Sequence, residues 1–251
     1  MTLQGKVAIV TGGGGAIGRA ICLELANAGA DVVVFDLLEE SAERTAGALK
    51  KQNAKSMACA VDVSNFDAVC AAAADVYQRF ERIDMLVNCA GGSARSKMAE
   101  FHLQSIEVIH WMLQVNLFGA LHCIRAVSPF MVQARRGSIV NVSSIVATGG
   151  KKGCVEYGAA KGGVIAATKS LAIELGKYNI TVNCVSPGLV QRDAVSDEKA
   201  FANRFSVVNR ICTQEDIANA VMFLVRPESD FITGQNLAVD GGRSLGLRGD
   251  N

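Results

Sequence analysis

The side chains best suited to acid–base chemistry in this chain are a tyrosine and a lysine that lie close together in the sequence. Tyr157 and Lys161 are four positions apart, so a helix would place both on one face. A free tyrosine has a pKa near 10, and lowering it by ~3 units requires roughly 4 kcal/mol of preferential stabilisation of the phenolate. A nearby ammonium group can supply part of that stabilisation, which would let the tyrosine exchange a proton with a hydroxyl or carbonyl oxygen.

Two polar residues upstream could complete such a site. Ser144 can donate a hydrogen bond to a substrate oxygen and steady it during proton transfer, and Asn116 precedes it. A Tyr-x-x-x-Lys pair alone more often belongs to a solvated helix face. The catalytic interpretation of Tyr157 and Lys161 therefore depends on a cofactor site elsewhere in the chain.

A glycine-rich turn near the N-terminus supplies that second motif. The segment 11–18 reads Thr-Gly-Gly-Gly-Gly-Ala-Ile-Gly and lies between an apolar strand and a helix. Glycines permit positive φ angles and close approach to a phosphate, and the following helix N-terminus favours a pyrophosphate. The alternative is a tight turn without a ligand. If the turn binds a dinucleotide, its contacts are expected from Gly12, Gly15, Ala16, Ile17 and Gly18.

An acidic residue follows at the position that such a site needs. Asp36 ends the apolar run 32–35, and its carboxylate could accept both adenosine ribose hydroxyls while repelling a 2′-phosphate. Leu37 and Gly15 are uncharged, whereas a residue that accommodates that phosphate would usually be cationic. The sequence therefore predicts NAD rather than NADP as the cofactor. The alternative is that Asp36 is an ordinary turn residue at a strand end.

Further cofactor contacts are expected where two later strands end. Asp62 can accept the adenine amino group, and Val63 follows it. Small Ala90 and Gly91 would let the cofactor pass close to the backbone. Asn88 belongs to the same set, although tying neighbouring strands together is its more favoured role.

The composition disfavours several classes of protein. Half of the 251 residues are apolar and the net charge is +1, which is typical of a soluble globular protein without a basic surface for nucleic acid or an anionic membrane. No apolar run approaches the ~20 residues of a membrane span, and the first six residues leave no room for a signal peptide. The 8 cysteines include no Cys-x-x-Cys pair. Neither a metal site nor a disulfide framework is expected, and a reducing cytoplasm fits best.

Short β-rich runs alternate with longer helical stretches along the chain. Strands are predicted at 6–10, 31–35, 55–61, 83–88, 138–142, 181–185 and 236–239, and helices at 17–28, 39–52, 66–80, 103–130, 157–178 and 214–225. Several strands are apolar on both faces, as a sheet covered by helices on each side requires. The alternation predicts a single-domain α/β Rossmann fold over 1–251, with a doubly wound parallel sheet flanked by helices.

Together these motifs resemble the classical short-chain dehydrogenase/reductase (SDR) family over essentially the full chain. The resemblance rests on the turn 11–18, the segment Asn88-Cys89-Ala90-Gly91, and Asn116, Ser144 and Tyr157-x-x-x-Lys161, which occur in the family's order. It implies that Asn116 holds a water that links Lys161 to solvent and that Lys161 contacts the nicotinamide ribose. It also implies that Pro187, Gly188 and Val190 flank the nicotinamide, with Tyr157 beside it.

Three positions depart from the family pattern. Ala16 replaces a usual glycine, which a tight turn still permits. Cys89 replaces an asparagine and is expected to pack as a small buried side chain rather than act in redox chemistry. Arg192 occupies a position where many relatives carry a threonine that holds the nicotinamide carboxamide, so it is not assigned to the cofactor.

Three irregular segments that follow strands, 91–100, 145–156 and 189–213, are expected to hold the substrate, the last as a substrate loop. They contain basic residues that could bind an anionic substrate, although solvated surface charges are the favoured interpretation: Arg95, Lys97, Lys151, Lys152, Arg192, Arg204 and Arg210. Trp111 is expected to pack within its own helix rather than contact substrate. Small residues after Tyr157 are consistent with a homodimer or homotetramer.

The expected activity is hydride transfer between NAD(H) and a small secondary alcohol or ketone. A sugar, a hydroxy acid, a 3-hydroxyacyl compound and a sterol all fit. One alternative is a 3-oxoacyl thioester reductase, an activity that in the family often uses NADPH. The alternative of another class is a catalytically silent dinucleotide-binding protein that acts as a redox sensor or scaffold.

Overall fold

The computed structural model describes residues 3–50, 55–92, 95–191 and 206–245. Within these ranges a 7-stranded sheet has the order β3-β2-β1-β4-β5-β6-β7, and every neighbouring pair is parallel. The strands are β1 Val7–Thr11, β2 Asp31–Asp36, β3 Ser56–Ala60, β4 Met85–Asn88, β5 Gly137–Val142, β6 Ile180–Pro187 and β7 Asn236–Val239. The predicted doubly wound Rossmann sheet is confirmed.

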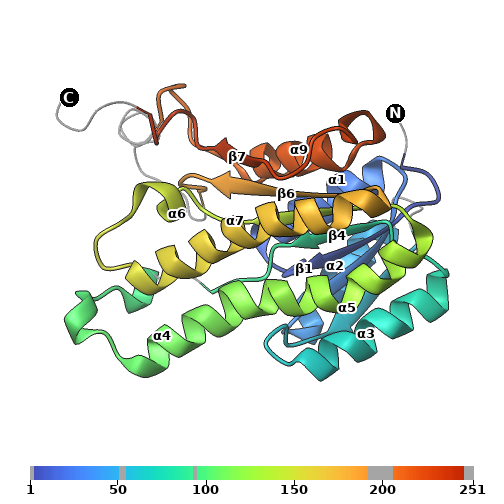
Figure 1. Ribbon diagram of the computed structural model, residues 1–251, viewed down its shortest axis with the longest axis horizontal. Coiled ribbons are helices and arrows are strands. Elements are labelled where there is room, and N and C mark those ends of the chain that lie inside the picture. The colour runs from blue at the N-terminus through green and yellow to red at the C-terminus, as the bar shows by residue number, and fades with distance from the viewer. Residues whose placement is uncertain (1–2, 51–54, 93–94, 192–205, 246–251) are drawn as a thin grey trace.

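Helices cover both faces of the sheet, as Figure 1 shows. One face carries α1 Ala16–Asn27, α2 Glu39–Lys50 and α9 Gln214–Val225, and the other carries α3 Phe66–Phe80, α5 Gly119–Ala134 and α7 Val155–Leu175. The strand order reverses between β1 and β4, so the connections that leave their carboxyl ends run to opposite faces of the sheet. In open parallel sheets such a reversal creates the crevice in which ligands bind.

The two-sided apolar strands follow from this layering. Along β1, Ala8 and Val10 pack with α1 and α2, whereas Val7 and Ile9 pack into the opposite core with α3 and α5. Successive strand residues point to opposite faces, so a sheet buried on both sides needs apolar residues at consecutive positions. This requirement accounts for the unbroken apolar runs in the sequence.

The predicted helix 103–130 is wrong in detail. A capping hydrogen bond from Val108 N–H to the Ser105 side chain begins α4 Ile106–Leu113, and a π-helical turn, Gln114–Phe118, joins α4 to α5. The run then continues past Pro129 to Ala134. Pro129 is exposed, so the carbonyl group that its ring deprives of a partner can be solvated.

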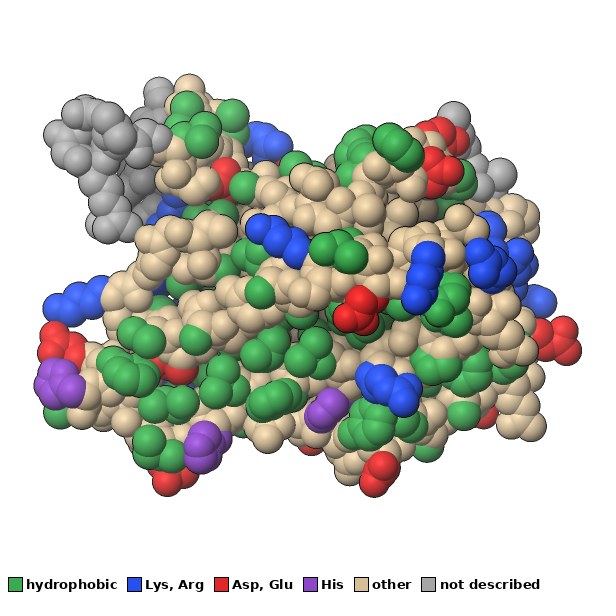
Figure 2. Space-filling model, viewed as in Figure 1, with side chains coloured by type: hydrophobic (Ala, Val, Ile, Leu, Met, Phe, Trp, Pro, Cys, Tyr) green, Lys and Arg blue, Asp and Glu red, His purple; other side chains and the backbone are tan. Residues whose placement is uncertain are grey.

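The run Ile106–Ala134 is 29 residues long with a hydropathy of 1.4, so by length and composition alone it could cross a membrane. This differs from the expectation that no apolar segment approaches that length. One side of the run packs on α3, α7 and the sheet. Hydrophobic side chains and histidines occupy its other side in Figure 2. Helices that cover a sheet pass the same test, so the finding by itself is weak support for a membrane span.

A buried carboxylate ties the amino ends of the central strands together. Asp84, 6% exposed, accepts two hydrogen bonds from Arg82 at 2.7 Å and one from the Val7 amide at 2.9 Å. Lys6 and Arg136 lie 3.6 Å from it. Burial alone would raise the pKa of the Asp84 carboxyl, but these partners outweigh that effect and hold its pKa below the usual range.

Replacing this carboxylate should destabilise the fold. Asp84→Asn should lower the free energy of unfolding at pH 7 by about 1–3 kcal/mol, because charged hydrogen bonds to a buried acceptor are lost. Urea denaturation followed by circular dichroism measures the change, with Asp230→Asn on the exposed surface as the control.

The destabilisation caused by Asp84→Asn should become smaller as the pH falls. Because the folded-state pKa of Asp84 is depressed, its contribution is present above the unfolded pKa of about 4 and is lost as pH falls through the lower folded value. The stability gap between wild type and Asp84→Asn should therefore narrow below pH 4. A gap that widens with acid would contradict the assignment.

Candidate active site

A cavity of about 1150 Å³ lies at the carboxyl ends of the strands. Among the predicted site residues, those that line it are Gly12, Gly15, Ala16, Ile17, Gly18, Asp36, Leu37, Asp62, Val63, Ala90, Gly91, Asn116, Ser144, Tyr157, Lys161, Pro187, Gly188 and Val190. The walls come from segments that follow strands β1 to β7, with Asn116, Tyr157 and Lys161 contributed by helices. Residues from distant parts of the sequence therefore share one cavity.

The glycine-rich turn forms the wall between β1 and α1. Gly12 has a φ of +65°, and a Cβ atom there would lie 2.8 Å from the Ala90 Cα, so the turn packs directly against the segment after β4. Helix α1 begins at Ala16 with no acidic residue in its first turn. Its unpaired N–H groups and dipole therefore present a positive potential suited to an anion. The Ala16 side chain is exposed, so this departure from the family pattern is accommodated.

The carboxylate of Asp36 is held by the backbone around it. The Gly14 N–H donates to Oδ2 at 2.9 Å and the Leu38 N–H donates to Oδ1 at 3.1 Å. A Cβ atom on Gly14 would lie 2.6 Å from the Ser41 Cβ and 2.9 Å from Asp36 Oδ2. Position 14 therefore has no room for a cationic side chain beside this carboxylate unless α2 shifts.

The second acid and the segment after β6 are also fixed by local hydrogen bonds. Asp62 Oδ1 accepts from the Ser64 amide at 2.9 Å and from its hydroxyl at 2.7 Å.

The Ile145 N–H donates to the Pro187 carbonyl at 3.2 Å, and the Gly188 N–H donates to the Val239 carbonyl at 2.9 Å. The loop that carries Ser144 is thereby tied to the end of β6.

Asn88 is the predicted site residue that does not line the cavity. It is 4% exposed, and its Nδ2 donates to Asn141 Oδ1 at 2.8 Å. The amide of Asn141 in turn donates to the Thr168 hydroxyl at 2.9 Å. These bonds link β4, β5 and α7 beneath the cavity, which is the strand-tying role that the sequence favoured.

The proton-transfer candidates meet where α7 crosses the end of β5. Lys161 is 5% exposed, and its Nζ donates to the Val142 carbonyl at 2.9 Å, one helical turn after Tyr157. Ser144 is 9% exposed, and its Oγ accepts from the Val146 N–H at 3.2 Å. That bond uses the hydroxyl as an acceptor and leaves its proton available to a ligand in the cavity.

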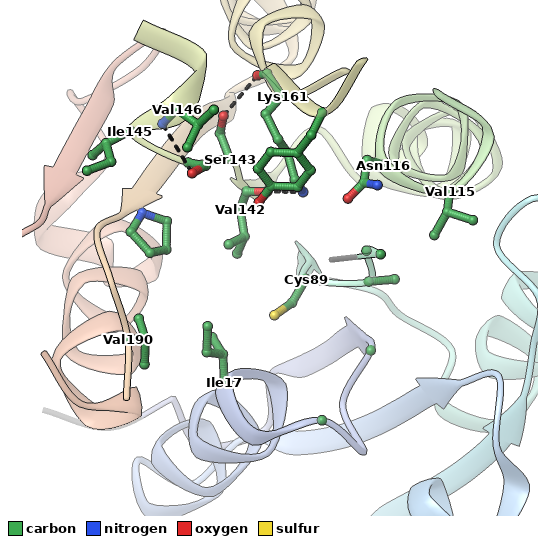
Figure 3. Close-up of a pocket in the computed structure, with 18 of the residues that line it drawn as sticks. Ile17, Cys89, Val115, Asn116, Val142, Ser143, Ile145, Val146, Lys161 and Val190 are labelled. Atoms are coloured by element: carbon green, nitrogen blue, oxygen red, sulfur yellow. Dashed lines mark hydrogen bonds between the residues drawn. The ribbon is translucent and has the colours of Figure 1, made fainter. Parts of the chain in front are cut away.

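Asn116 faces this group from the π-helical turn. Its Nδ2 donates to the Met112 carbonyl at 3.1 Å, while its buried Oδ1 has no hydrogen-bond partner among the described residues. A Cβ atom on Gly91 would lie 2.6 Å from that oxygen and 3.4 Å from Lys161 Nζ. Figure 3 shows the side chains of Asn116 and Lys161 directed into the same space. π-Helical turns often occur at functional sites, and this one places a buried amide beside the ammonium group.

Burial shifts the pKa values of two side chains that line the cavity, in each case toward the neutral form. Burial lowers the pKa of the Lys161 ammonium group. Burial likewise raises the pKa of the Cys89 thiol to about 11, so that thiol is neutral near pH 7. Cys89 packs partly against the core, yet its sulfur points into the cavity in Figure 3. The expectation of a buried packing side chain is therefore only partly met.

Several cavity residues were missed or assigned elsewhere by sequence reasoning. Trp111 was expected to pack within its helix but lines the cavity, and a Cβ atom on Gly92 would collide with its ring. Ile145, Val146 and Cys154 belong to the segment 145–156 that was expected to hold the substrate, and the unassigned residues include Val115, Gln214, Arg243, Ser244 and Leu245. The segment 240–245 follows β7, so the rule that ligands bind beyond the carboxyl ends of strands could have indicated it.

The predicted basic residues separate into groups. Arg95 and Lys151 line the cavity, and Lys97 Nζ lies 5.2 Å from the Trp111 ring centroid. Lys152 pairs with Glu100 at 3.1 Å. Arg210 pairs with Asp216, whose carboxylate also caps α9. Arg192, Arg204 and most of the predicted substrate loop 189–213 lie outside the described residues.

Comparison with known proteins agrees with this geometry. Residues 14–244 match a family described as "Enoyl-(Acyl carrier protein) reductase". The chain is 38% identical to the short-chain reductase protein NovJ of Streptomyces niveus, over 96% of this chain and 94% of that protein. It is 34% identical to the 3-oxoacyl-(acyl-carrier-protein) reductase FabG of Thermotoga maritima, over 96% of this chain and 99% of that protein.

A solved structure gives the same result in three dimensions. Carveol dehydrogenase from Mycobacterium avium, in complex with NAD, superposes with a TM-score of 0.91 at 29% identity. The superposition covers 97% of this chain and 99% of that one. The chain belongs to the short-chain dehydrogenase/reductase family of oxidoreductases.

Proposed function

We propose that this oxidoreductase transfers a hydride between NAD(H) and a secondary alcohol or ketone. The observation that carries the proposal is the single cavity that joins the N-terminus of α1 and Asp36 to Ser144, Tyr157 and Lys161. The first group suits a dinucleotide and the second suits proton transfer. A hydride donor and a proton donor acting on one carbonyl group are what such a reaction requires.

The residues fit a dinucleotide along the length of the cavity. The turn at Gly12 leaves no side chain between the backbone and a phosphate, and α1 offers unpaired N–H groups. Proposed cofactor contacts are Gly12, Gly15, Ala16, Ile17 and Gly18 for the pyrophosphate, Asp36 and Leu37 for the adenosine ribose, Asp62 and Val63 for the adenine, and Ala90, Gly91, Tyr157, Lys161, Pro187, Gly188 and Val190 toward the nicotinamide. Asn88 would support this wall from beneath.

The chain's own residues would manage the proton. When bound, NAD supplies the hydride acceptor. Tyr157 takes the proton from the substrate hydroxyl during oxidation and returns it during reduction. Lys161 stabilises the phenolate electrostatically, and Ser144 donates a hydrogen bond to the substrate oxygen. Asn116 Oδ1 accepts from a water that links Lys161 to solvent.

Two alternatives remain to be tested against this proposal. The FabG relative favours a 3-oxoacyl thioester reductase, which would be a special case of the same chemistry. A catalytically silent sensor would have no need for the four polar residues that share the cavity. Oxidation of sugars, hydroxy acids, 3-hydroxyacyl thioesters and hydroxysteroids with NAD or NADP separates these possibilities, because a sensor would bind NADH yet turn over none of them.

The cofactor preference should depend on Asp36. The wild type should bind NADH at least ~10-fold more tightly than NADPH, a difference of about 1.4 kcal/mol. Asp36→Ala should weaken NADH binding and narrow that ratio, because the carboxylate both accepts ribose hydroxyls and repels a 2′-phosphate. Fluorescence titration of each nucleotide measures the ratio. Asp31→Ala, at the other end of β2, is the matched control, and tighter binding of NADPH by the wild type would refute the preference.

Turnover should depend on the Tyr157 hydroxyl. Tyr157→Phe should reduce kcat by at least ~10²-fold with any accepted alcohol, because general acid–base catalysis contributes 10²–10⁴-fold. Its NADH affinity should stay within a few-fold of wild type. Steady-state kinetics and nucleotide titration provide the two readings, and Tyr178→Phe outside the cavity is the matched control. Normal turnover by Tyr157→Phe would rule out the proposed proton path.

A further inference from the structure

The charges that line the cavity are separated between its two sides. The acids among the described lining residues, Asp36 and Asp62, follow β2 and β3. Arg95 follows β4 and Lys151 follows β5, on the other side of the strand-order reversal. The second side therefore presents positive charge near the proton-transfer residues, where a substrate would bind.

The segments that carry Arg95 and Lys151 are in contact with each other. A Cβ atom on Gly153 would lie 3.3 Å from the Ala99 carbonyl oxygen and 3.5 Å from the Met98 Cβ. The ion pair between Lys152 and Glu100 joins the same two segments at 3.1 Å. Both cations therefore belong to one rim of the cavity, although they come from segments far apart in the sequence.

A polar bridge holds this rim against the catalytic helix. Gln104 Nε2 donates to the Lys97 carbonyl at 2.7 Å and to Glu156 Oε1 at 3.3 Å. Glu156 is 3% exposed and immediately precedes Tyr157 in α7. The exposed segment that carries Arg95 is thus tied to the helix of Tyr157 by a partly buried hydrogen bond.

An apolar wall lies within the same part of the cavity. Trp111, Val146 and Cys154 line it, and Val146 and Cys154 pack with Met112 and Tyr157. A site with an apolar wall and two cations at its rim suits a ligand with an apolar body and a terminal anionic group.

We propose that Arg95 and Lys151 form an anion-binding subsite that selects alcohols or ketones carrying an oxyanion group beside an apolar body. The proposal rests on the proposed function, since it names the substrate class of the same cavity. The oxyanion could be a carboxylate of the substrate itself or a phosphate of a thioester carrier. Both are bound by guanidinium and ammonium groups through the same charged hydrogen bonds.

Ligand binding tests the subsite without requiring turnover. Trp111 is the single tryptophan of the chain and lines the cavity, so its fluorescence reports on this region directly. The NAD-saturated protein is titrated with 4-phenylbutanoate, with its uncharged amide and with coenzyme A. We expect the wild type to bind at least one of the two anions tightly, and 4-phenylbutanoate at least ~10-fold more tightly than the amide if a substrate carboxylate is the natural group.

The double variant Arg95→Gln/Lys151→Gln should lose the tight binding of the anion, while its affinities for the amide and for NAD stay within about 2-fold of those of the wild type. Lys169→Gln is the matched control, because Lys169 is exposed on α7 and does not line the cavity. If the double variant loses affinity for 4-phenylbutanoate, the natural anionic group is a substrate carboxylate. If it loses affinity for coenzyme A alone, the natural group is a carrier phosphate. Equal affinities of the carboxylate and the amide with no coenzyme A binding, or anion binding unchanged in the double variant, would overturn the subsite.

The kinetic counterpart separates this proposal from the proposed function. With a 3-hydroxy acid and its methyl ester, the double variant should raise KM for the acid at least ~10-fold and change kcat little, because it removes binding rather than chemistry. The enzyme could oxidise the ester in a reaction that depends on NAD and Tyr157, yet show no preference for the acid or for a thioester over the ester. That result would support the proposed function and reject the subsite. Anion binding that depends on Arg95 and Lys151, without turnover of any substrate, would support the subsite and reject the proposed function.

Discussion

The burial of the Lys161 ammonium group constrains the architecture of this site more than any other interaction. A buried charge is costly unless hydrogen bonds compensate it, and Lys161 donates to the Val142 carbonyl at 2.9 Å. The Ser143 hydroxyl in turn donates to the Lys161 carbonyl at 2.8 Å. These bonds fix α7 on the carboxyl end of β5. The π-helical turn places Asn116 beside this group, and a Cβ atom on Gly91 would lie 2.6 Å from Asn116 Oδ1, so position 91 has no room for a side chain.

The sheet makes this arrangement possible because its strand order reverses beside β1. The turn before α1 and Asp36, proposed to hold the dinucleotide, lie on one side of the reversal, and the residues proposed to transfer the proton lie on the other. Buried amides of Asn88 and Asn141 join β4 to β5 on this second side. Positive charge from Arg95 and Lys151 then extends the second side outward. The residues proposed to select the cofactor and those proposed to select the substrate therefore occupy separate parts of one cavity.

Much of this was predictable because the signals are local. The alternation of apolar runs predicted the sheet, and the turn 11–18 and the spacing of Tyr157 and Lys161 pointed to residues that share the cavity. The π-helical turn was not predictable, since its wider backbone geometry carries no periodicity of its own in the sequence. The cavity position of Trp111 was also missed, because it depends on a glycine at 92 that is distant along the chain. Similarly, the exclusion of a side chain at Gly14 arises from packing against α2.

The most direct test of the account follows the hydride itself. A secondary alcohol deuterated at the carbinol carbon is incubated with the protein and NAD, and the nucleotide is analysed by mass spectrometry and NMR. Hydride transfer to NAD in this cavity predicts deuterium at C4 of the nicotinamide, in amounts equal to the ketone formed, and a primary isotope effect in a single turnover. Ketone formation without label in the nucleotide, or labelling that requires NADP, would contradict hydride transfer to NAD in this cavity.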